Sequence, residues 1–168
     1  SQFALIKDHQ GLVEDLAFNA KGLLLTASHD GTARLWDTDG VLIGNLRHQT
    51  PPTFVAFNPD GSRVVTGGQD RVGHIWDVKS GHEIAQLESR IDQFQDAVYS
   101  PDGGHVATGS RSGTISMWDS ETGRQTMEMK GHTFAVTDIR FGPRGDTLLS
   151  TSSDGTARLW NAATGSEL

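Results

Sequence analysis

The stretch DGTARLW at residues 30–36 occurs again, letter for letter, at residues 154–160. Imperfect copies lie between these two and become visible when the tryptophans are aligned. The four tryptophans stand 40, 42 and 42 residues apart, at Trp36, Trp76, Trp118 and Trp160. A fixed period of this size indicates a stacked or radial repeat architecture.

Each repeat follows the same local pattern. An apolar run of strand length is followed by a four-residue turn and a second apolar run, and the turns read NAKG, NPDG, SPDG and GPRG. Proline in the second position has the φ angle that a type I turn needs, and glycine in the fourth accepts a positive φ. The pattern predicts a β-hairpin, which a second tight turn extends to a third strand ending in tryptophan, and a further turn to a fourth strand.

Three parts of the last repeat resemble the WD-repeat family: Gly131-His132 before the first strand, Asp154-Gly155 in the second turn, and Trp160. The resemblance covers the whole chain. It implies an all-β fold, a β-propeller of WD-repeat type with four blades of four antiparallel strands. We expect one propeller domain or half-propeller over residues 1–168, with repeats at approximately 9–47, 48–89, 90–131 and 132–168, and residues 1–8 as an outer strand that closes the last blade.

The number of blades is the anomaly, because WD-repeat rings usually have seven or eight and this chain carries four repeats. Three arrangements would bury the faces of the end repeats: two chains in an eight-bladed ring, one chain in a four-bladed ring, or an excerpt of a longer ring. We favour a homodimer that completes an eight-bladed ring. The chain is close to four whole periods, and such a ring needs half the rotation per blade of a four-bladed one.

A histidine, a hydroxyl, a turn aspartate and the tryptophan recur as a set. The family resemblance implies that each set is a hydrogen-bonded structural tetrad, whose buried donors and acceptors polarise one another. The third repeat keeps Thr108 and Trp118 but has Arg90 and Ser112 in place of histidine and aspartate. We attribute this to drift, and Arg111 in the same turn leaves a functional cause open. The expected tetrads are His9, Thr26, Asp30 and Trp36; His48, Thr66, Asp70 and Trp76; and His132, Ser150, Asp154 and Trp160.

Serine, histidine and aspartate could also form a catalytic triad. An active site needs one such set beside an oxyanion site, whereas this set recurs in three repeats. The sequence has no HExxH spacing, no GxxxxGK[ST] phosphate loop and no cysteine. Asp37-Thr-Asp-Gly40 begins like a calcium loop but lacks the later ligands. We expect no catalytic residue, no metal and no cofactor.

Binding surfaces in WD-repeat proteins commonly use the rim where the first strands begin, together with the residue before the turn aspartate. The resemblance therefore implies a partner-binding rim. It contains no tryptophan or tyrosine, the residue types that most often anchor interfaces. The rim residues are Leu12, Glu14, His29, Pro51, Thr53, Gln69, Gln93, Gln95, Arg111, Ala135, Thr137 and Ser153.

Composition limits the partners. Hydrophobic residues at 35% and charged residues at 21% are typical of soluble globular proteins, and no apolar run is long enough to span a membrane. The net charge of −7 disfavours nucleic acid or an anionic membrane as the main partner. We expect a cytoplasmic, non-catalytic scaffold that presents its rim to a protein or peptide. The alternatives are a regulatory or sensor segment of a larger WD-repeat signalling protein and a propeller-based hydrolase or lyase.

Overall fold

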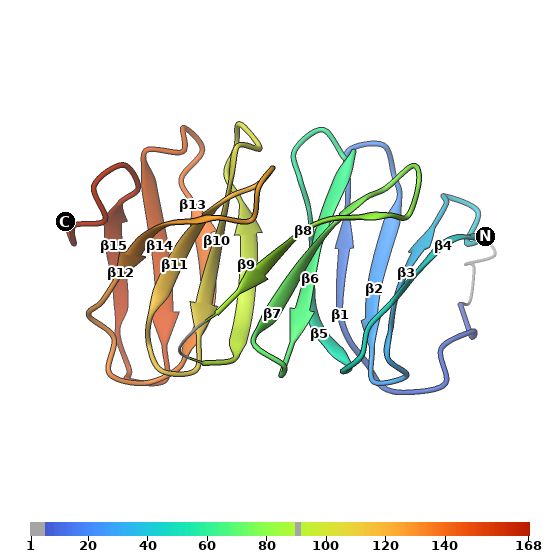
Figure 1. The fold of residues 1–168 in the computed structure, drawn as a ribbon, viewed down its shortest axis with the longest axis horizontal. Helices are drawn as coiled ribbons and strands as arrows, with labels where there is room; N and C mark the ends of the chain where they lie inside the picture. The colour runs from blue at the N-terminus through green and yellow to red at the C-terminus, as the bar shows by residue number, and fades with distance from the viewer. Residues whose placement is uncertain (1–5, 90–91) are drawn as a thin grey trace, which may run out of the picture.

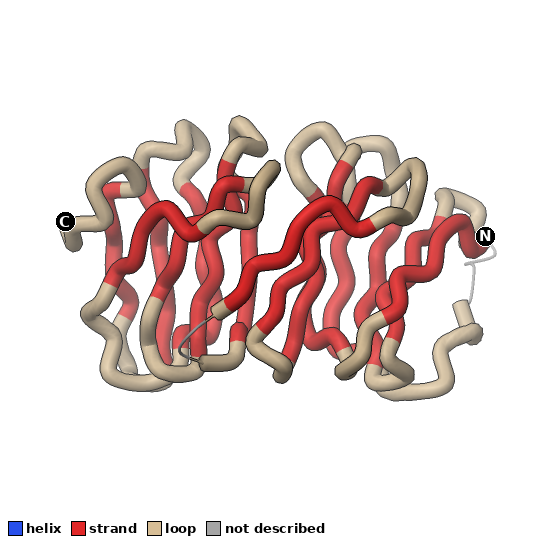
Figure 2. Tube along the Cα trace, viewed as in Figure 1, coloured by secondary structure: helices blue, strands red, loops and turns tan. Residues whose placement is uncertain are grey.

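The computed structural model describes residues 6–89 and 92–168. This part of the chain is all-β, with fifteen strands and no helix. The strands form four antiparallel sheets, here called blades 1 to 4, which stand side by side in chain order (Figure 1). Loops join the strands at the two ends of every blade (Figure 2). Blades 1 and 4 are therefore the two ends of the row.

Blades 1 and 2 are four-stranded meanders in which each strand pairs with the next one along the chain. Blade 1 consists of β1 (Val13–Phe18), β2 (Leu24–Ser28), β3 (Thr32–Trp36) and β4 (Leu42–Arg47). Blade 2 consists of β5 (Pro52–Phe57), β6 (Arg63–Gly68), β7 (Val72–Asp77) and β8 (Glu83–Glu88).

Blades 3 and 4 repeat the meander, but blade 4 has three strands among the described residues. Blade 3 consists of β9 (Phe94–Tyr99), β10 (His105–Ser110), β11 (Ile115–Asp119) and β12 (Gln125–Met129). Blade 4 consists of β13 (Val136–Phe141), β14 (Thr147–Ser152) and β15 (Ala157–Asn161).

The turns between the first and second strands have the predicted geometry. In the NPDG turn, Gly61 has a φ of 71° and its N–H donates to the Asn58 carbonyl at 3.0 Å. Gly103 and Gly145 close the equivalent turns, each with a φ of 75°. The hairpins predicted from these four-residue turns are confirmed.

The first strands lie on the inner side of the row. β1 contacts β5, β5 contacts β9 and β9 contacts β13. Residues of all four strands line one open hollow of about 510 Å³. The blades thus radiate from a shared centre, as the blades of a propeller do.

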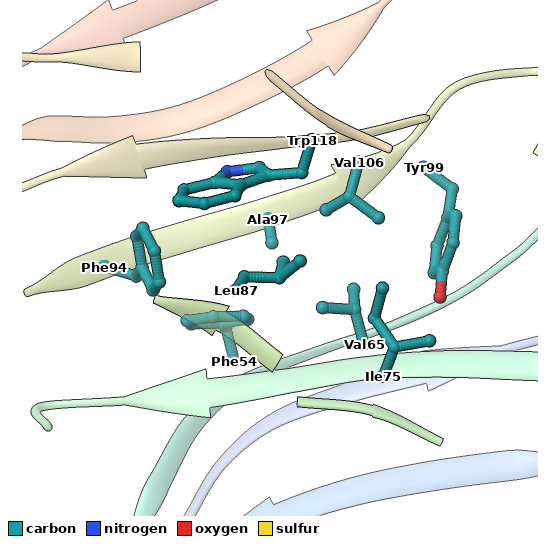
Figure 3. Close-up of a cluster of buried hydrophobic side chains, with 9 residues drawn as sticks. All are labelled: Phe54, Val65, Ile75, Leu87, Phe94, Ala97, Tyr99, Val106 and Trp118. Carbon is teal, nitrogen blue, oxygen red and sulfur yellow. The ribbon is translucent and has the colours of Figure 1, made fainter. Parts of the chain in front are cut away.

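One apolar cluster lies between each pair of consecutive blades. Figure 3 shows the cluster between blades 2 and 3, where Trp118 and Phe94 lie on one side and Val65 and Ile75 on the other. Because successive strand residues point to opposite faces, Val64 belongs to the cluster on the other side of blade 2. Each interior blade is therefore covered on both faces.

The predicted all-β fold with four repeated sheets of antiparallel strands is confirmed, and ring closure by a second chain stays a prediction. Blade 4 has three strands among the described residues, and its fourth strand, expected from residues 1–8, stays a prediction. There β15 is followed by a bridge between Trp160 and Glu167 and by hydrogen bonds from Asn161 N to Ser166 O at 2.8 Å and from Leu168 N to Leu159 O at 2.9 Å. The outer strand predicted at residues 1–8 falls mostly outside the described residues, and residues 6–8 lie in no strand.

Candidate functional site

A buried hydroxyl at the centre of each blade accepts the indole N–H of the blade's tryptophan. We call this hydroxyl the hub. The two residues lie ten positions apart on the second and third strands, which the tight turn between them brings side by side. The Nε1–Oγ distance is 2.8–2.9 Å in Trp36–Thr26, Trp76–Thr66, Trp118–Thr108 and Trp160–Ser150.

In blade 1 the hub continues into a histidine and an aspartate. His9 Nε2 lies 2.7 Å from Thr26 Oγ1, and His9 Nδ1 lies 2.8 Å from Asp30 Oδ2. The imidazole therefore joins the segment before β1 to the turn between β2 and β3. Blade 4 repeats this arrangement at 2.8 and 2.9 Å with Ser150, His132 and Asp154.

The direction of these hydrogen bonds follows from the donors available. An indole N–H can only donate, so the hub oxygen accepts from tryptophan and its own hydrogen is free for histidine Nε2. Histidine Nδ1 then carries the ring hydrogen and donates it to the carboxylate. Blades 1 and 4 each contain one such chain of three hydrogen bonds from tryptophan to aspartate.

The carboxylates of Asp30 and Asp154 are held ionised at neutral pH. Burial raises the pKa of Asp30, but hydrogen bonds from Thr32, His9 and the Gln10 N–H outweigh it and lower the pKa well below its usual range. At Asp154, the hydrogen bond from the Thr156 hydroxyl is the largest cause of an equally strong lowering of the pKa. Both aspartates therefore fix turn geometry as anions.

Blade 2 brings together three of the four predicted residues. His48 Nε2 lies 3.0 Å from Thr66 Oγ1, but Asp70 accepts only the Val72 N–H at 3.2 Å, and no described hydrogen bond joins Asp70 to His48. The His74 ring stands edge-on to His48, with centroids 4.9 Å apart. Burial is the largest cause that lowers the pKa of His48 to about 4; His74 also lowers it, and Asp70 opposes the change. The His48 ring is therefore neutral at pH 7.

Blade 3 keeps only the bond between Trp118 and Thr108 among the described residues. Arg90, which takes the histidine position, lies outside the described residues. Ser112 takes the aspartate position, and its hydroxyl lies 3.0 Å from the Ser110 hydroxyl. Phe94 packs edge-on against Trp118, with centroids 5.8 Å apart.

The Ser150, His132 and Asp154 distances are those of a catalytic triad, but their surroundings differ. Ser150 is 1% exposed, and its oxygen already accepts the Trp160 N–H. Blade 1 builds the same chain from a threonine hub. A nucleophile must reach its substrate, so the buried Ser150 oxygen has no access to one. Among the described residues no three His, Asp or Glu side chains gather as metal ligands would.

The rim residues lie at one end of the blades, where each first strand begins. The same backbone hydrogen bond places them in three blades: His29 N to Leu12 O at 2.8 Å, Arg111 N to Gln93 O at 3.0 Å, and Ser153 N to Ala135 O at 2.9 Å. The remaining rim residues of the four blades are Glu14, Pro51, Thr53, Gln69, Gln95 and Thr137.

The rim has its own charge and apolar contacts. His29 Nε2 and Glu14 Oε1 form an ion pair at 2.7 Å. Leu12 is 64% exposed, and Phe134 beside the rim of blade 4 is 63% exposed. Thr53, Gln93 and Ala135 are half-buried, while the other predicted rim residues are exposed. Sequence reasoning missed Phe134, although a lone aromatic residue directly before a predicted rim position was the signal.

Aspartates of the inner strands were also missed. Asp15 Oδ2 accepts the Val55 N–H of the next blade at 2.9 Å, and Asp96 Oδ2 accepts the Ile139 N–H at 3.0 Å. Burial raises the pKa of Asp96, and the neighbouring Asp138 adds to this. The recurrence of aspartate in VEDLAF, QDAVY and VTDIRF was the available signal. These carboxylates join consecutive blades.

A recess of about 340 Å³ lies between blades 3 and 4 at the end opposite the rim, with Met127 and Phe141 among its lining residues. At the preceding junction Arg63 and Glu121 form an ion pair at 3.3 Å, and both residues line an open pocket of about 500 Å³. His105 and Ala163 take these two positions between blades 3 and 4.

Comparison with known families agrees with the geometry. Four stretches of the chain match the family described as WD domain, G-beta repeat, at residues 2–37, 40–77, 81–119 and 123–161. The chain is a WD-repeat protein. Each of the last three stretches begins just before the outer strand of one blade and ends with the tryptophan strand of the next. One WD repeat of the sequence therefore contributes the outer strand of one blade and the first three strands of the next.

Curated relatives of this WD-repeat protein match over parts of their length. They include F-box-like/WD repeat-containing protein TBL1X of Mus musculus, 36% identical over 77 residues, 45% of this chain and 15% of the relative. Serine-threonine kinase receptor-associated protein of Dictyostelium discoideum is 33% identical over 94 residues, 54% of this chain and 32% of the relative. Pre-mRNA-processing factor 17 of Homo sapiens is 30% identical over 96 residues, 54% of this chain and 17% of the relative. The matches span about a third or less of these relatives.

No helix among residues 6–89 and 92–168 is long and apolar enough to cross a membrane.

Proposed function

We propose that this WD-repeat protein is a non-catalytic scaffold that presents the rim of its blades to a protein or peptide partner. The observation that carries the proposal is the contrast between a repeated interior and a varied rim. All four blades bury the same pair of tryptophan and hub hydroxyl. The residue before the turn aspartate, or before its replacement Ser112, is different in every blade: His29, Gln69, Arg111 and Ser153.

A repeated frame with different exposed side chains suits recognition of an irregular partner. Exposed apolar groups at Leu12 and Phe134 supply contact area, and the Glu14–His29 pair and Arg111 supply charge. The net charge of −7 favours a protein partner over nucleic acid. The burial of Ser150 supports a non-catalytic role.

The proposal includes a ring that is completed by a second chain, so that the rim is continuous. Repeat blades need neighbours to bury both faces, and blades 1 and 4 each have one described neighbour. Two four-blade chains supply the eight blades of a complete ring.

The experiment is an affinity capture with matched charge reversals. Arg111→Glu changes an exposed side chain on the rim, and Lys79→Glu changes an exposed side chain at the opposite end of blade 2. Proteins retained by the wild type should be lost with Arg111→Glu and with Leu12→Asp, and kept with Lys79→Glu. Retention of the same proteins by all three variants would contradict a partner-binding rim.

A second candidate is a regulatory or sensor segment of a larger WD-repeat signalling protein. The observation that favours it is coverage: the match spans 32% of a serine-threonine kinase receptor-associated protein and 15% of an F-box-like protein. The sequence of the full gene distinguishes the candidates, since further repeats or an effector domain in the same reading frame would support this one.

A further inference from the structure

The recess between blades 3 and 4 reaches the apolar layer between the two sheets. Met117 and Met127 line it from blade 3, and Phe141 lines it from blade 4. All three side chains pack in the apolar cluster of this junction. The recess of about 340 Å³ is therefore a gap at one end of that cluster, and both of its walls belong to consecutive blades of this chain.

The preceding junction is built differently at the same level. Ile75, Ala85 and Tyr99 take the equivalent positions there and pack in one cluster. Tyr99 lies at one end of that cluster and is 5% exposed (Figure 3), whereas Phe141 is half-buried. Among the described residues, the open pocket of that junction is lined by polar residues and glycines alone. An apolar wall thus distinguishes the recess between blades 3 and 4 from the pocket before it.

An exposed carboxylate among the lining residues has one unused oxygen. Asp102 Oδ1 accepts the Ser100 hydroxyl at 2.5 Å and the Gly104 N–H at 3.0 Å. These two hydrogen bonds are the largest causes that lower the pKa of Asp102, so the side chain is ionised at pH 7. Within the part of the chain that the structure describes, Oδ2 accepts no hydrogen bond. The recess therefore offers a fixed negative charge with a free acceptor.

The positive charge of Arg144, which also lines the recess, is balanced within its own turn. Arg144 Nη2 lies 2.9 Å from Asp146 Oδ2. The remaining titratable residue of the lining is His105. Asp102 is thus the carboxylate that an incoming group can neutralise. The net charge of −7 attracts cations at long range and acts in the same direction.

An arginine side chain matches both the apolar wall and the carboxylate. Its long apolar stem packs on apolar surface while its guanidinium remains polar, and the guanidinium stacks on aromatic rings such as that of Phe141. Methionine side chains such as Met127 adapt to the shape of what they contact. A guanidinium is more weakly hydrated than the ammonium of lysine, so it enters a partly apolar recess more readily. A volume of about 340 Å³ is near the lower end of the range for ligand sites and suits one side chain.

We propose that the recess binds an arginine side chain from a peptide segment of a partner protein. The stem lies against Met127 and Phe141, and the guanidinium donates to Asp102 Oδ2. The recess opens between turns that expose Arg144 and Ala163, and the rest of the peptide can lie across them. This is a second binding site at the end opposite the rim, and it does not rest on the rim proposed above.

The test titrates short blocked peptides and observes the methionine methyl groups by NMR. The chain has three methionines, of which Met117 and Met127 line the recess and Met129, 1% exposed, is not among the lining residues. Acetyl-Gly-Arg-Gly-amide should shift the Met127 methyl resonance in a saturable manner and leave that of Met129 in place. The same peptide with citrulline has the shape of arginine without its charge and should bind about tenfold more weakly.

Two variants of the recess have matched controls in blade 2. Asp102→Asn keeps an acceptor for the turn, removes the charge and should weaken binding of the arginine peptide about tenfold, whereas Asp60→Asn changes the same turn position and should not. Ala163→Trp places a large ring at the recess and should abolish the Met127 shift, whereas Lys79→Trp at the equivalent turn position should preserve it. Circular dichroism of all four variants should match that of the wild type.

Several results would overturn the proposal. An unshifted Met127 methyl at saturating peptide or an unchanged shift in Ala163→Trp would mean that the recess is not the site. Equal affinities for the arginine and citrulline peptides, or for wild type and Asp102→Asn, would remove the role of the charge. Tighter binding of the corresponding lysine or leucine peptide would identify a different occupant.

The rim and the recess fail independently. Arg111→Glu and Leu12→Asp change the rim at the other end of the blades and should bind the arginine peptide as tightly as the wild type. Loss of partner capture in those variants therefore reports on the rim alone, and loss of the Met127 shift in Ala163→Trp reports on the recess alone.

Discussion

Blades 1 and 3 bury the same tryptophan–threonine pair and surround it differently. In blade 1 the hub Thr26 extends through His9 to Asp30, and the His9 ring stands 6.0 Å from Trp36, at 69° to it. In blade 3 the aromatic neighbour of the tryptophan is Phe94, 5.8 Å away and at 89°. An apolar ring in blade 3 thus makes the kind of edge-on contact that a hydrogen-bonded imidazole makes in blade 1.

This difference separates what a blade requires from what it tolerates. The tryptophan and the hub hydroxyl are common to all four blades, whereas the bond between histidine and aspartate is found in blades 1 and 4 of the described chain. Packing of the indole is the more important contribution to every blade. The hydrogen-bond chain adds to it by fixing the loop before the first strand. The predictions below test that order of importance.

The largest effect should come from the shared tryptophan. Trp36→Ala and Trp118→Ala each remove a side chain that is at most 2% exposed and should lower the free energy of unfolding by about 3–5 kcal/mol. Chemical denaturation of the two variants provides the measurement. A loss that is several-fold smaller for Trp118 would mean that blade 3 does not share the frame of blade 1.

Removal of a hub hydroxyl should lower the free energy of unfolding more when that hydroxyl makes more hydrogen bonds. Thr26→Val leaves both His9 and Trp36 without their partner and should cost about 1–3 kcal/mol. Thr108→Val is the same change in blade 3. Among the described residues it leaves only the Trp118 N–H without a partner, so it should lower the free energy of unfolding by about 1 kcal/mol. Equal losses in equilibrium unfolding would contradict the account.

The free energy of unfolding should depend on pH because of His48 in blade 2. Burial and the neighbouring His74 lower its pKa to about 4 in the folded protein, against 6.5 as the ordinary value. The unfolded chain then binds more protons than the folded one between these values, so stability falls as pH drops from about 6.5 to about 4, by roughly 1 kcal/mol per pH unit or less. His48→Gln should remove that part of the slope in melting curves measured across this range. A slope unchanged by the substitution would exclude His48 as its source.

The smallest effect on stability should come from the turn between β6 and β7 in blade 2. Arg71 has a φ of 66°, where the other three blades have Gly31, Gly113 and Gly155. A left-handed backbone is costly for a residue with a Cβ, so Arg71→Gly should stabilise the protein by about 0.5–1 kcal/mol. Gly155→Arg is the reverse control, because a Cβ there meets nothing within 4 Å and only the φ of 83° opposes it. Destabilisation by Arg71→Gly would show that its side chain, and not its backbone, decides the turn.

The repeated parts of the fold could be predicted from the sequence and the individual contacts could not. Proline and glycine dictate the turns, and the period of the tryptophans places the third strands, because both act locally. In blade 2 the His74 ring stands edge-on to His48 and no described hydrogen bond joins His48 to Asp70; no local sequence rule predicts either feature. Similarly, Asp15 and Asp96 act on the next blade, about forty residues away in the chain.

The hydrogen-bond chain from tryptophan to aspartate is the central claim, and nitrogen-15 NMR of the histidine rings tests it most directly. At pH 7, His9 and His132 should both carry their hydrogen on Nδ1, and that hydrogen should be protected from exchange by the carboxylate 2.8–2.9 Å away. The His48 ring, which has no such carboxylate bond among the described residues, should show no protected Nδ1 hydrogen. Rings of His9 and His132 protonated on Nε2 instead would reverse the chain and contradict the account.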